Sequence, residues 1–296
     1  MENGTEMAQK NMKKLAEHTF TAEALEQMVD HVLASRDELY RDFAWRRTTD
    51  PYEVLVSEVM LQQTQTQRVI RYFDYWIAQF PTFDALASAA QVDVLEAWQG
   101  LGYNRRCLAL YRCAQQVSEQ HHGICPRTEE ELVALPGVGP ATAAGVLAFA
   151  FNEPSAYLET NVRTVVLHEL WPDEDEVNDR SVLAAVQAAA VEIAARGVDA
   201  RLWNYALLDY GAWLKKTLPN PSRRSKHHTK QSAYEGSRRQ KRAALLRSVL
   251  DTPQRDAIYY AKACGYDVDV AEDVLSSLAA EGFVCREEQG TYIIAR

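Results

Sequence analysis

The chain has 296 residues, of which 47% are hydrophobic, and this is enough for a large core and about two domains. No apolar run is long enough to span a bilayer, and the first residues lack the basic and apolar regions of a signal peptide, so we expect a cytoplasmic protein. The formal net charge of −9 is unusual for a nucleic-acid-binding protein, but residues 215–242 hold ten Lys or Arg against one acidic residue.

In chain order, residues 1–20 are polar and are expected to be a flexible N-terminus. From 21 to 214 apolar residues recur three and four apart, as in Val54, Leu55 and Val59, and no alternating strand pattern stands out. Gly and Pro breaks separate the periodic segments. This part of the chain is therefore predicted to be all-α.

The block 215–242 is predicted to be a basic linker or an extended arm, because it combines Pro219, Pro221 and Gly236 with many basic residues. Residues 243–296 form a second small unit with five basic and nine acidic residues. The expected elements are a helix from Thr252-Pro253 to about Ala263, a helix from about Val270 to Ala280, and a hairpin of 283–286 with 291–294. This order is typical of a winged-helix-like α+β domain. Its acidic balance favours a packing or partner-binding role at least as much as DNA contact.

Five cysteines occur at irregular spacing, namely Cys107, Cys113, Cys125, Cys264 and Cys285. An odd, scattered set argues against a disulfide framework and against a metal cluster, which needs close, paired ligands.

The most informative segment is 135–142, which reads LPGVGPAT. Gly137 and Gly139 give the turn backbone conformations that side chains would block. The turn can then press its N–H groups and the next helix N-terminus against a phosphate. This is typical of a helix-hairpin-helix that grips the DNA backbone, although a plain helix–helix connector has the same pattern.

Three further segments carry a resemblance. Residues 51–66 read PYEVLVSEVMLQQTQT, residues 98–103 read WQGLGY, and residues 158–163 read LETNVR. With the turn, they resemble the helix-hairpin-helix DNA glycosylases over roughly residues 25–215, most closely the branch that removes adenine opposite G or oxidised G. The resemblance implies a two-lobed all-α core and a double-stranded DNA partner containing a mismatch or damaged base. We expect a monomer.

The chemistry implied is breakage of an N-glycosidic bond in a base taken out of the stack, for which one acid and one carboxylate suffice. Glu58 matches the glutamate that protonates adenine at N7, and burial between apolar neighbours would keep it protonated. Glu159 matches the second carboxylate, although the family usually has aspartate, and it would stabilise the sugar cation. Asn161 would orient Glu159 or contact a phosphate.

The resemblance also assigns residues that contact DNA. Gln63 and Tyr103 match residues inserted into the duplex near the opposite base, although a packing role is an alternative for Tyr103. Ala141 stands where bifunctional relatives carry the lysine of strand cleavage, so a monofunctional enzyme is predicted. The remaining expected contacts are Gln62, Thr64, Asn104, Arg105, Gly137, Val138, Gly139, Thr142 and Arg163. A monovalent cation on the backbone carbonyls of Val133, Leu135 and Val138 is also implied.

Two family features are missing. No cysteine occurs between Cys125 and Cys264, where the iron–sulfur cluster is expected, so no cofactor is predicted. The basic arm occupies that place, and we hypothesise that its side chains replace the cluster loop as phosphate ligands: Arg223, Arg224, Lys226, Arg238 and Arg239. A metal at His227 and His228 is disfavoured. The nudix-like C-terminal domain that helps recognise oxidised guanine is replaced by the winged-helix-like unit.

These features predict hydrolytic base excision without strand cleavage, with adenine opposite G or 8-oxoguanine as the best substrate. Two alternatives stay open. One is a glycosylase of the same fold for another base, such as T or U opposite G, hypoxanthine or an alkylated purine. The other is a mismatch- or damage-binding protein with little catalysis, for which Glu159 in place of aspartate is the main support.

Overall fold

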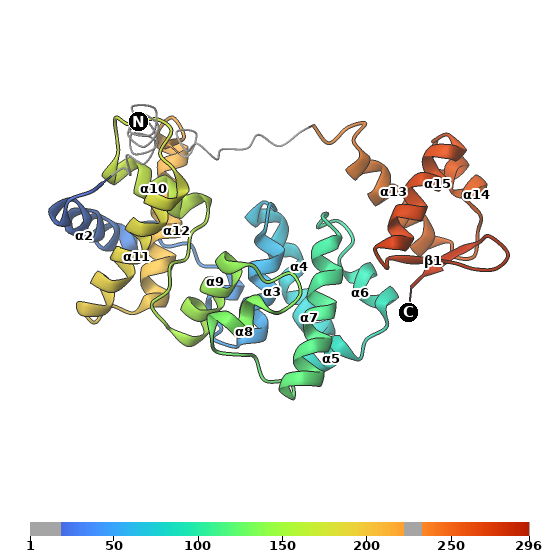
Figure 1. The fold of residues 1–296 in the computed structure, drawn as a ribbon, viewed down its shortest axis with the longest axis horizontal. Helices are drawn as coiled ribbons and strands as arrows, with labels where there is room; N and C mark the ends of the chain where they lie inside the picture. The colour runs from blue at the N-terminus through green and yellow to red at the C-terminus, as the bar shows by residue number, and fades with distance from the viewer. Residues whose placement is uncertain (1–18, 222–232, 296) are drawn as a thin grey trace, which may run out of the picture. The chain divides into compact units, whose positions relative to one another are not determined.

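The computed structural model describes residues 19–221 and 233–295, which are mostly helical (Figure 1). Two compact units result, and each is built from two separate stretches of chain. Of the described residues, the first unit comprises 19–42 and 147–221, and the second comprises 43–146 and 233–295. The all-α prediction for the core is confirmed within the described ranges.

The first unit packs its helices around a close contact between α10 and α12. Gly211 makes this contact possible, because a Cβ there would come within 2.2 Å of the Asn161 carbonyl oxygen. Helix α2 packs against α10, α11 and α12, and Trp171 and Trp203 are fully buried between these elements. The helices of this unit are α2 (Ala22–Leu39), α10 (Thr160–Leu170), α11 (Asp179–Ala195) and α12 (Ala200–Thr217).

The second unit begins with α3, whose start follows from its sequence. Asp50 caps the helix through its side chain, which accepts hydrogen bonds from the backbone N–H groups of Tyr52 and Glu53, and Pro51 takes the first helical position. The Tyr52 hydroxyl donates to the Phe80 carbonyl at 2.6 Å and accepts from Trp76 Nε1 at 3.2 Å, which ties α3 to α4. The elements are η1 (Ala44–Arg46), α3 (Pro51–Leu61), α4 (Thr66–Gln79), α5 (Phe83–Ala87), α6 (Gln91–Ala97), α7 (Arg105–His121), α8 (Glu129–Val133) and α9 (Pro140–Phe151), whose last turn belongs to the first unit.

The C-terminal segment has the predicted order of helices and hairpin, with one extra helix. Its elements are α13 (Arg238–Asp251), α14 (Ala257–Cys264), α15 (Val268–Ala280), β1 (Val284–Arg286) and β2 (Tyr292–Ile294). Strands β1 and β2 pair antiparallel, with Val284 opposite Ile294. The predicted hairpin and the helix ending at Ala280 are confirmed.

The start predicted for α14 at Thr252-Pro253 is wrong. The Gln254 N–H donates to the Tyr292 carbonyl, the Tyr292 N–H donates to the Arg255 carbonyl, and Gln254 has a φ of 62°, so the chain is not helical there. The helix begins only after Asp256, whose side chain accepts from the Tyr259 N–H at 2.8 Å. The preceding helix α13 was not predicted.

The C-terminal segment belongs to the same unit as residues 43–146. Gln91 Nε2 donates to the carbonyls of Gly282 and Phe283 at 2.8 and 3.4 Å, and Arg112 donates to the Glu281 carbonyl at 3.0 Å. These side-chain-to-backbone hydrogen bonds join α6 and α7 to the start of the hairpin.

The expected basic arm is helical at both ends. Helix α12 continues to Thr217, and α13 begins at Arg238, so Lys215 and Arg242 both lie within helices. Arg223, Arg224, Lys226 and both histidines of the block lie outside the described residues. No helix in the described ranges is long and apolar enough to cross a membrane.

Candidate active site

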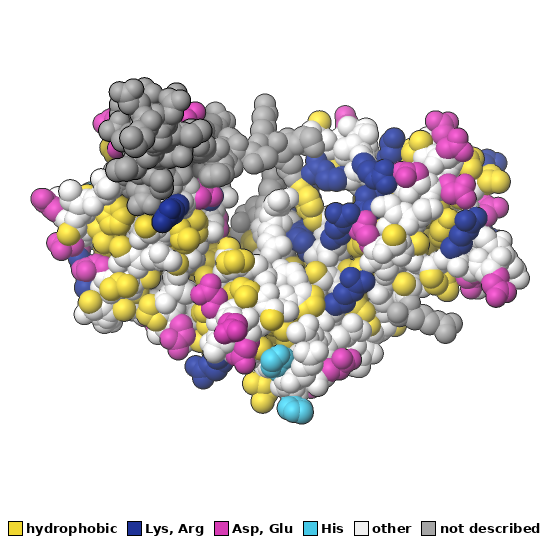
Figure 2. Space-filling model, in the orientation of Figure 1, with side chains coloured by type: hydrophobic (Ala, Val, Ile, Leu, Met, Phe, Trp, Pro, Cys, Tyr) yellow, Lys and Arg dark blue, Asp and Glu magenta, His cyan; other side chains and the backbone are white. Residues whose placement is uncertain are grey.

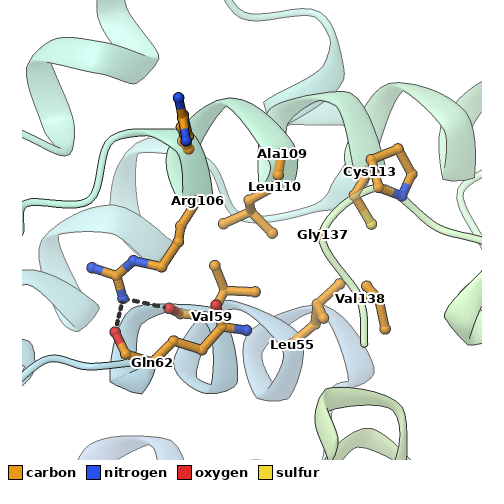
Figure 3. A pocket seen from close by; sticks show the side chains of 11 residues that line it. Leu55, Val59, Gln62, Arg106, Ala109, Leu110, Cys113, Gly137 and Val138 are labelled. Carbon is orange, nitrogen blue, oxygen red and sulfur yellow. Dashed lines mark hydrogen bonds between the residues drawn. The ribbon is translucent and has the colours of Figure 1, made fainter. Parts of the chain in front are cut away.

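Two loops of the second unit carry the predicted DNA-inserting residues, and Arg106 joins them. One guanidinium nitrogen of Arg106 donates to the carbonyls of Val59 and Gln62 at 2.8 and 2.6 Å, at the end of α3 (Figure 3). The same nitrogen also donates to the Met60 carbonyl at 2.9 Å. The other donates to Thr64 Oγ1 and to the Gly102 carbonyl, both at 3.0 Å. Burial lowers the pKa of Arg106 to about 10, so the group stays charged at neutral pH. Arg106 was not predicted as a site residue.

Gln63 and Tyr103, the two predicted insertion residues, share an unusual backbone conformation. Their φ angles are 54° and 50°, in the left-handed region that residues with side chains seldom adopt. Such residues persist only where the surroundings hold them, and they concentrate at functional sites. Gln63 is exposed and Tyr103 is partly exposed. Arg106 supports both loops, because it bonds to Gln62 and Thr64 on either side of Gln63 and to the Gly102 carbonyl just before Tyr103.

The hairpin turn between α8 and α9 presents small residues at the surface. Gly137 has a φ of 76°, and a Cβ there would come within 2.7 Å of the Ala109 Cβ on α7. Gly139 has neither a positive φ nor a neighbour that a Cβ would meet. The prediction that a side chain would be excluded is therefore confirmed for Gly137 and wrong for Gly139. Gly137, Gly139 and Ala141 are exposed while Val138 is buried. An approaching phosphate therefore meets little side-chain bulk.

The turn is connected to the loop after α3. Thr142 is buried in α9 and accepts a hydrogen bond from Gln62 Nε2 at 3.1 Å. Both were predicted as DNA contacts, and in this structure their side chains bond to each other. A pocket of about 220 Å³ lies between α3, α7 and the turn (Figure 3). Its walls include Leu55, Val59, Arg106, Leu110, Cys113 and Val138.

Glu58 lies on α3, one turn before the end of the helix. Its neighbours Ser57 and Val59 are buried, whereas Glu58 is partly exposed. The residues on either side of Glu58 are thus in the core, whereas Glu58 keeps part of its own surface outside it.

Glu159 is the N-cap of α10 in the first unit. Its Oε1 atom accepts hydrogen bonds from the backbone N–H groups of Asn161 and Val162 at 2.6 and 3.1 Å. Removal from water raises the pKa of Glu159, while Lys215 and the hydrogen bonds from Asn161 and Val162 oppose that shift. The helix N-terminus also favours negative charge. The net result is a raised pKa, because burial outweighs the effects that favour the charged form.

Lys215 was missed by the sequence analysis as a neighbour of Glu159. It lies one turn after Gly211 on α12, on the side that packs closely against Asn161. Burial lowers the pKa of Lys215, and Glu159 opposes this shift. No motif marks such a lysine, because its partner is 56 residues away in the sequence.

Asn161 and Arg163 follow Glu159 on α10. The Asn161 Oδ1 atom is buried and has no hydrogen-bond partner among the described residues, which leaves one acceptor for a bound group. Arg163 pairs with Asp179 through two bonds of 2.9 and 3.2 Å. To contact a phosphate, Arg163 would have to bind it alongside the Asp179 carboxylate or in its place.

Several predicted DNA contacts from basic residues are engaged within the second unit. Arg105 binds Glu281 at 2.6 and 2.8 Å, Arg238 pairs with Asp273, and Arg239 bonds to the Tyr103 hydroxyl. Lys and Arg side chains gather on the face that carries α13 and the start of α7 (Figure 2). Asn104 is the N-cap residue of α7.

The comparisons with known proteins agree with these features. Residues 56–186 match the family described as HhH-GPD superfamily base excision DNA repair protein. Over 287 residues the chain is 32% identical to an adenine DNA glycosylase of Mycobacterium tuberculosis, with 89% of this chain and 92% of the relative covered. The chain belongs to the adenine DNA glycosylase family. A relative from Mycolicibacterium smegmatis with the same description is 31% identical, with 89% and 94% covered.

This DNA glycosylase also shares its fold with solved structures. A thermostable thymine-DNA glycosylase superposes with a TM-score of 0.56 and 24% identity, covering 64% of this chain and 87% of that one. The likeness confirms the helix-hairpin-helix glycosylase fold. It leaves the excised base to be argued from the residues and from the family.

Proposed function

We propose that this DNA glycosylase excises adenine mispaired with G or with oxidised G, and that it does so without cutting the strand. Family membership supports adenine as the base, because the match to adenine DNA glycosylases extends over nearly the whole of both chains. Ala141 supports the lack of strand cleavage, because an alanine at the exposed end of the turn has no amine for a Schiff base. The protein acts as a monomer on a duplex.

In the proposed mechanism, Glu58 donates a proton to adenine as the N-glycosidic bond breaks and the bonding electron pair leaves with the base. The positive charge that develops on the sugar is stabilised by the carboxylate of Glu159, oriented by Asn161. Water then adds to the sugar carbon and loses a proton, which leaves an abasic site.

Gln63 and Tyr103 are proposed to enter the space of the displaced adenine and to contact the opposite base. Their exposure and their left-handed backbone support this role. The exposed turn at Gly137, Gly139 and Ala141 contacts the backbone phosphates, assisted by Thr142 and the neighbouring peptide groups. A monovalent cation on the carbonyls of Val133, Leu135 and Val138 would steady that turn.

The donor set does not fit an iron–sulfur cluster. Cys107, Cys113 and Cys125 are buried, and burial raises the pKa of each thiol, which opposes the thiolate form that a cluster requires. Cys264 and Cys285 belong to separate elements of the C-terminal segment. No step of the proposed mechanism uses a metal.

The decisive experiment is single-turnover excision on labelled duplexes that contain A:G, A:8-oxoguanine, T:G, U:G, hypoxanthine:T or an alkylated purine. Cleavage at A that appears only after alkali, and that Glu58→Gln abolishes, is the expected result. Excision of another base would replace the substrate but keep the mechanism. Tight mismatch binding without any excision would overturn the proposal in favour of a binding protein.

A further inference from the structure

A contact between the C-terminal segment and the Tyr103 loop has no place in the mechanism above. Arg239 of α13 donates a hydrogen bond to the Tyr103 hydroxyl at 2.6 Å, although the two residues are 136 positions apart. The guanidinium groups of Arg239 and Arg106 also lie 5.5 and 5.4 Å from the centre of the Tyr103 ring. The ring and the hydroxyl of Tyr103 are therefore both held by arginines.

The position of Arg239 is itself fixed. Three residues later on α13, Arg242 binds both carboxylate oxygens of Glu281 at 2.9 and 2.8 Å. Arg105, next to Arg106 on α7, binds the same carboxylate. Glu281 thus links α13 to the start of the helix that follows the Tyr103 loop, and the paired guanidiniums hold the pKa of Glu281 down at about 2.

Tyr103 needs such support because of its backbone. A bulky residue in the left-handed region is strained, and it keeps this conformation only where its surroundings hold it. Trp98 Nε1 and Arg106 both bond to the Gly102 carbonyl and hold the peptide before Tyr103, but they leave the tyrosine hydroxyl without a partner. Arg239 supplies that partner.

We infer that Arg239 is a positioning residue that holds Tyr103 ready to insert beside the base opposite the target, so that the C-terminal segment acts on mispair recognition through this loop. The inference rests on the proposed function of Tyr103. In this role the C-terminal segment does not have to bind phosphates itself. The role is therefore compatible with the excess of acidic residues in 243–296. Ordering the ring before DNA binds removes an entropic penalty from recognition.

The test combines two readouts on full-length protein variants. The first is fluorescence of 2-aminopurine placed next to the base opposite the target, which rises when an inserted side chain unstacks it. The duplex carries a 2′-fluorinated target nucleotide that resists excision, so this readout needs no catalysis. The second is the ratio of single-turnover rates for adenine opposite G and adenine opposite C.

We expect Arg239→Met to lower both the fluorescence rise and the rate ratio, the ratio by about tenfold, as is typical for loss of one hydrogen bond to a charged group. Arg239→Lys should restore part of each, since an ammonium can still donate to the hydroxyl. Arg247→Met is the matched control, because Arg247 is an exposed arginine of the same helix that contacts Gln99 instead. Its values should equal those of the unmodified protein.

The double-mutant cycle with Tyr103→Phe tests the coupling directly. Once the hydroxyl is absent, Arg239→Met should add clearly less than it does alone. Full additivity, or unchanged fluorescence and rate ratio in Arg239→Met, would overturn the inference. A larger fluorescence rise in Arg239→Met would also overturn it, since Arg239 would then restrain Tyr103 from inserting. Failure of the unmodified protein to excise any base would defeat the proposed function while leaving the fluorescence result readable.

Discussion

At the scale of single residues, the carboxyl group of Glu159 is subject to two opposite influences on its pKa. As an N-cap it accepts two backbone hydrogen bonds at the start of α10, which favours the charged form. As a group withdrawn from water it is pushed toward the neutral form. Lys215 adds to the first effect, and so the charge available to the sugar cation depends on a residue of another helix.

Replacing Glu159 with Gln should lower the single-turnover excision rate by about 100-fold or more, because a preorganised charge facing the cation is lost. Glu159→Asp keeps the cap but draws the carboxylate back by one bond, and we expect it to lose rate as well. Thermal unfolding of both variants controls for damage to α10. A faster Glu159→Asp enzyme would contradict this prediction, and would show that glutamate impairs the site.

The pH dependence of excision should expose the role of Lys215. Because Glu159 must be ionised and its pKa is raised by burial, the rate should fall as the pH drops through that raised pKa. Lys215→Met removes a cation that lowers the pKa of Glu159, so the acidic limb should move to higher pH. Lys216→Met, an exposed neighbour, is the control. Superimposable profiles for the two variants would assign the limb to another group.

At the scale of elements, the site depends on helix ends and turns more than on helix faces. Arg106 closes the end of α3 and holds the loop before α7, while Gly137 lets the hairpin turn lie against Ala109. The motifs correctly predicted a turn between two helices at 135–139, and Gln63 lies in the loop that follows α3. The arrangement that holds these loops could not be predicted, because a helical period does not say which carbonyls an arginine will reach.

Gly137→Ala should destabilise the protein by about 1–3 kcal/mol, because the new methyl group meets Ala109 and the backbone conformation is strained for alanine. Gly139→Ala is the matched control. It has open space around its Cα and an ordinary backbone conformation, so its effect should stay within about 0.5 kcal/mol. Chemical denaturation measures both. Equal destabilisation by the two substitutions would contradict the role given to Gly137.

At the scale of the whole molecule, the C-terminal segment is grouped with residues 43–146 in the second unit. Its second helix and its hairpin could be predicted from the periodic apolar residues of 270–280 and from the turn before Thr291, whereas Pro253 misplaced the start of α14. Helix α13 was not predicted because four of its first five residues are Lys or Arg, and only Leu245, Leu246, Val249 and Leu250 are buried. The hydrogen bonds from Gln91 and Arg112 to the start of the hairpin could not be predicted either, because they join residues about 170 to 190 positions apart.

The charge of Glu281 should control how firmly α13 is held. Glu281→Gln weakens the bonds from both Arg105 and Arg242, so backbone hydrogen exchange in residues 238–251 should become faster. In the unmodified protein the folded-state pKa of Glu281 is about 2, below its ordinary value of 4.5, so its contribution is complete above about 4.5 and is lost as the pH falls toward 2. Glu272→Gln, which disturbs only an exposed pair with Arg286, is the control. If Glu281→Gln leaves the exchange rates of residues 238–251 unchanged, Gln91 and the apolar contacts are sufficient to hold α13.

The interleaving of the two units has a consequence for how the protein is made. Helix α2 leaves the ribosome long before its partner α12, and the contact between Arg41 and Asp209 spans 168 residues. At elongation rates of about 5–20 residues per second, the wait is roughly 8–35 s. The apolar face of α2 is exposed during that time, and residues 43–146 wait in the same way for α13 and α15. Nascent chains of this glycosylase should therefore depend on chaperones, and a truncation before α12 should aggregate rather than fold as a smaller domain.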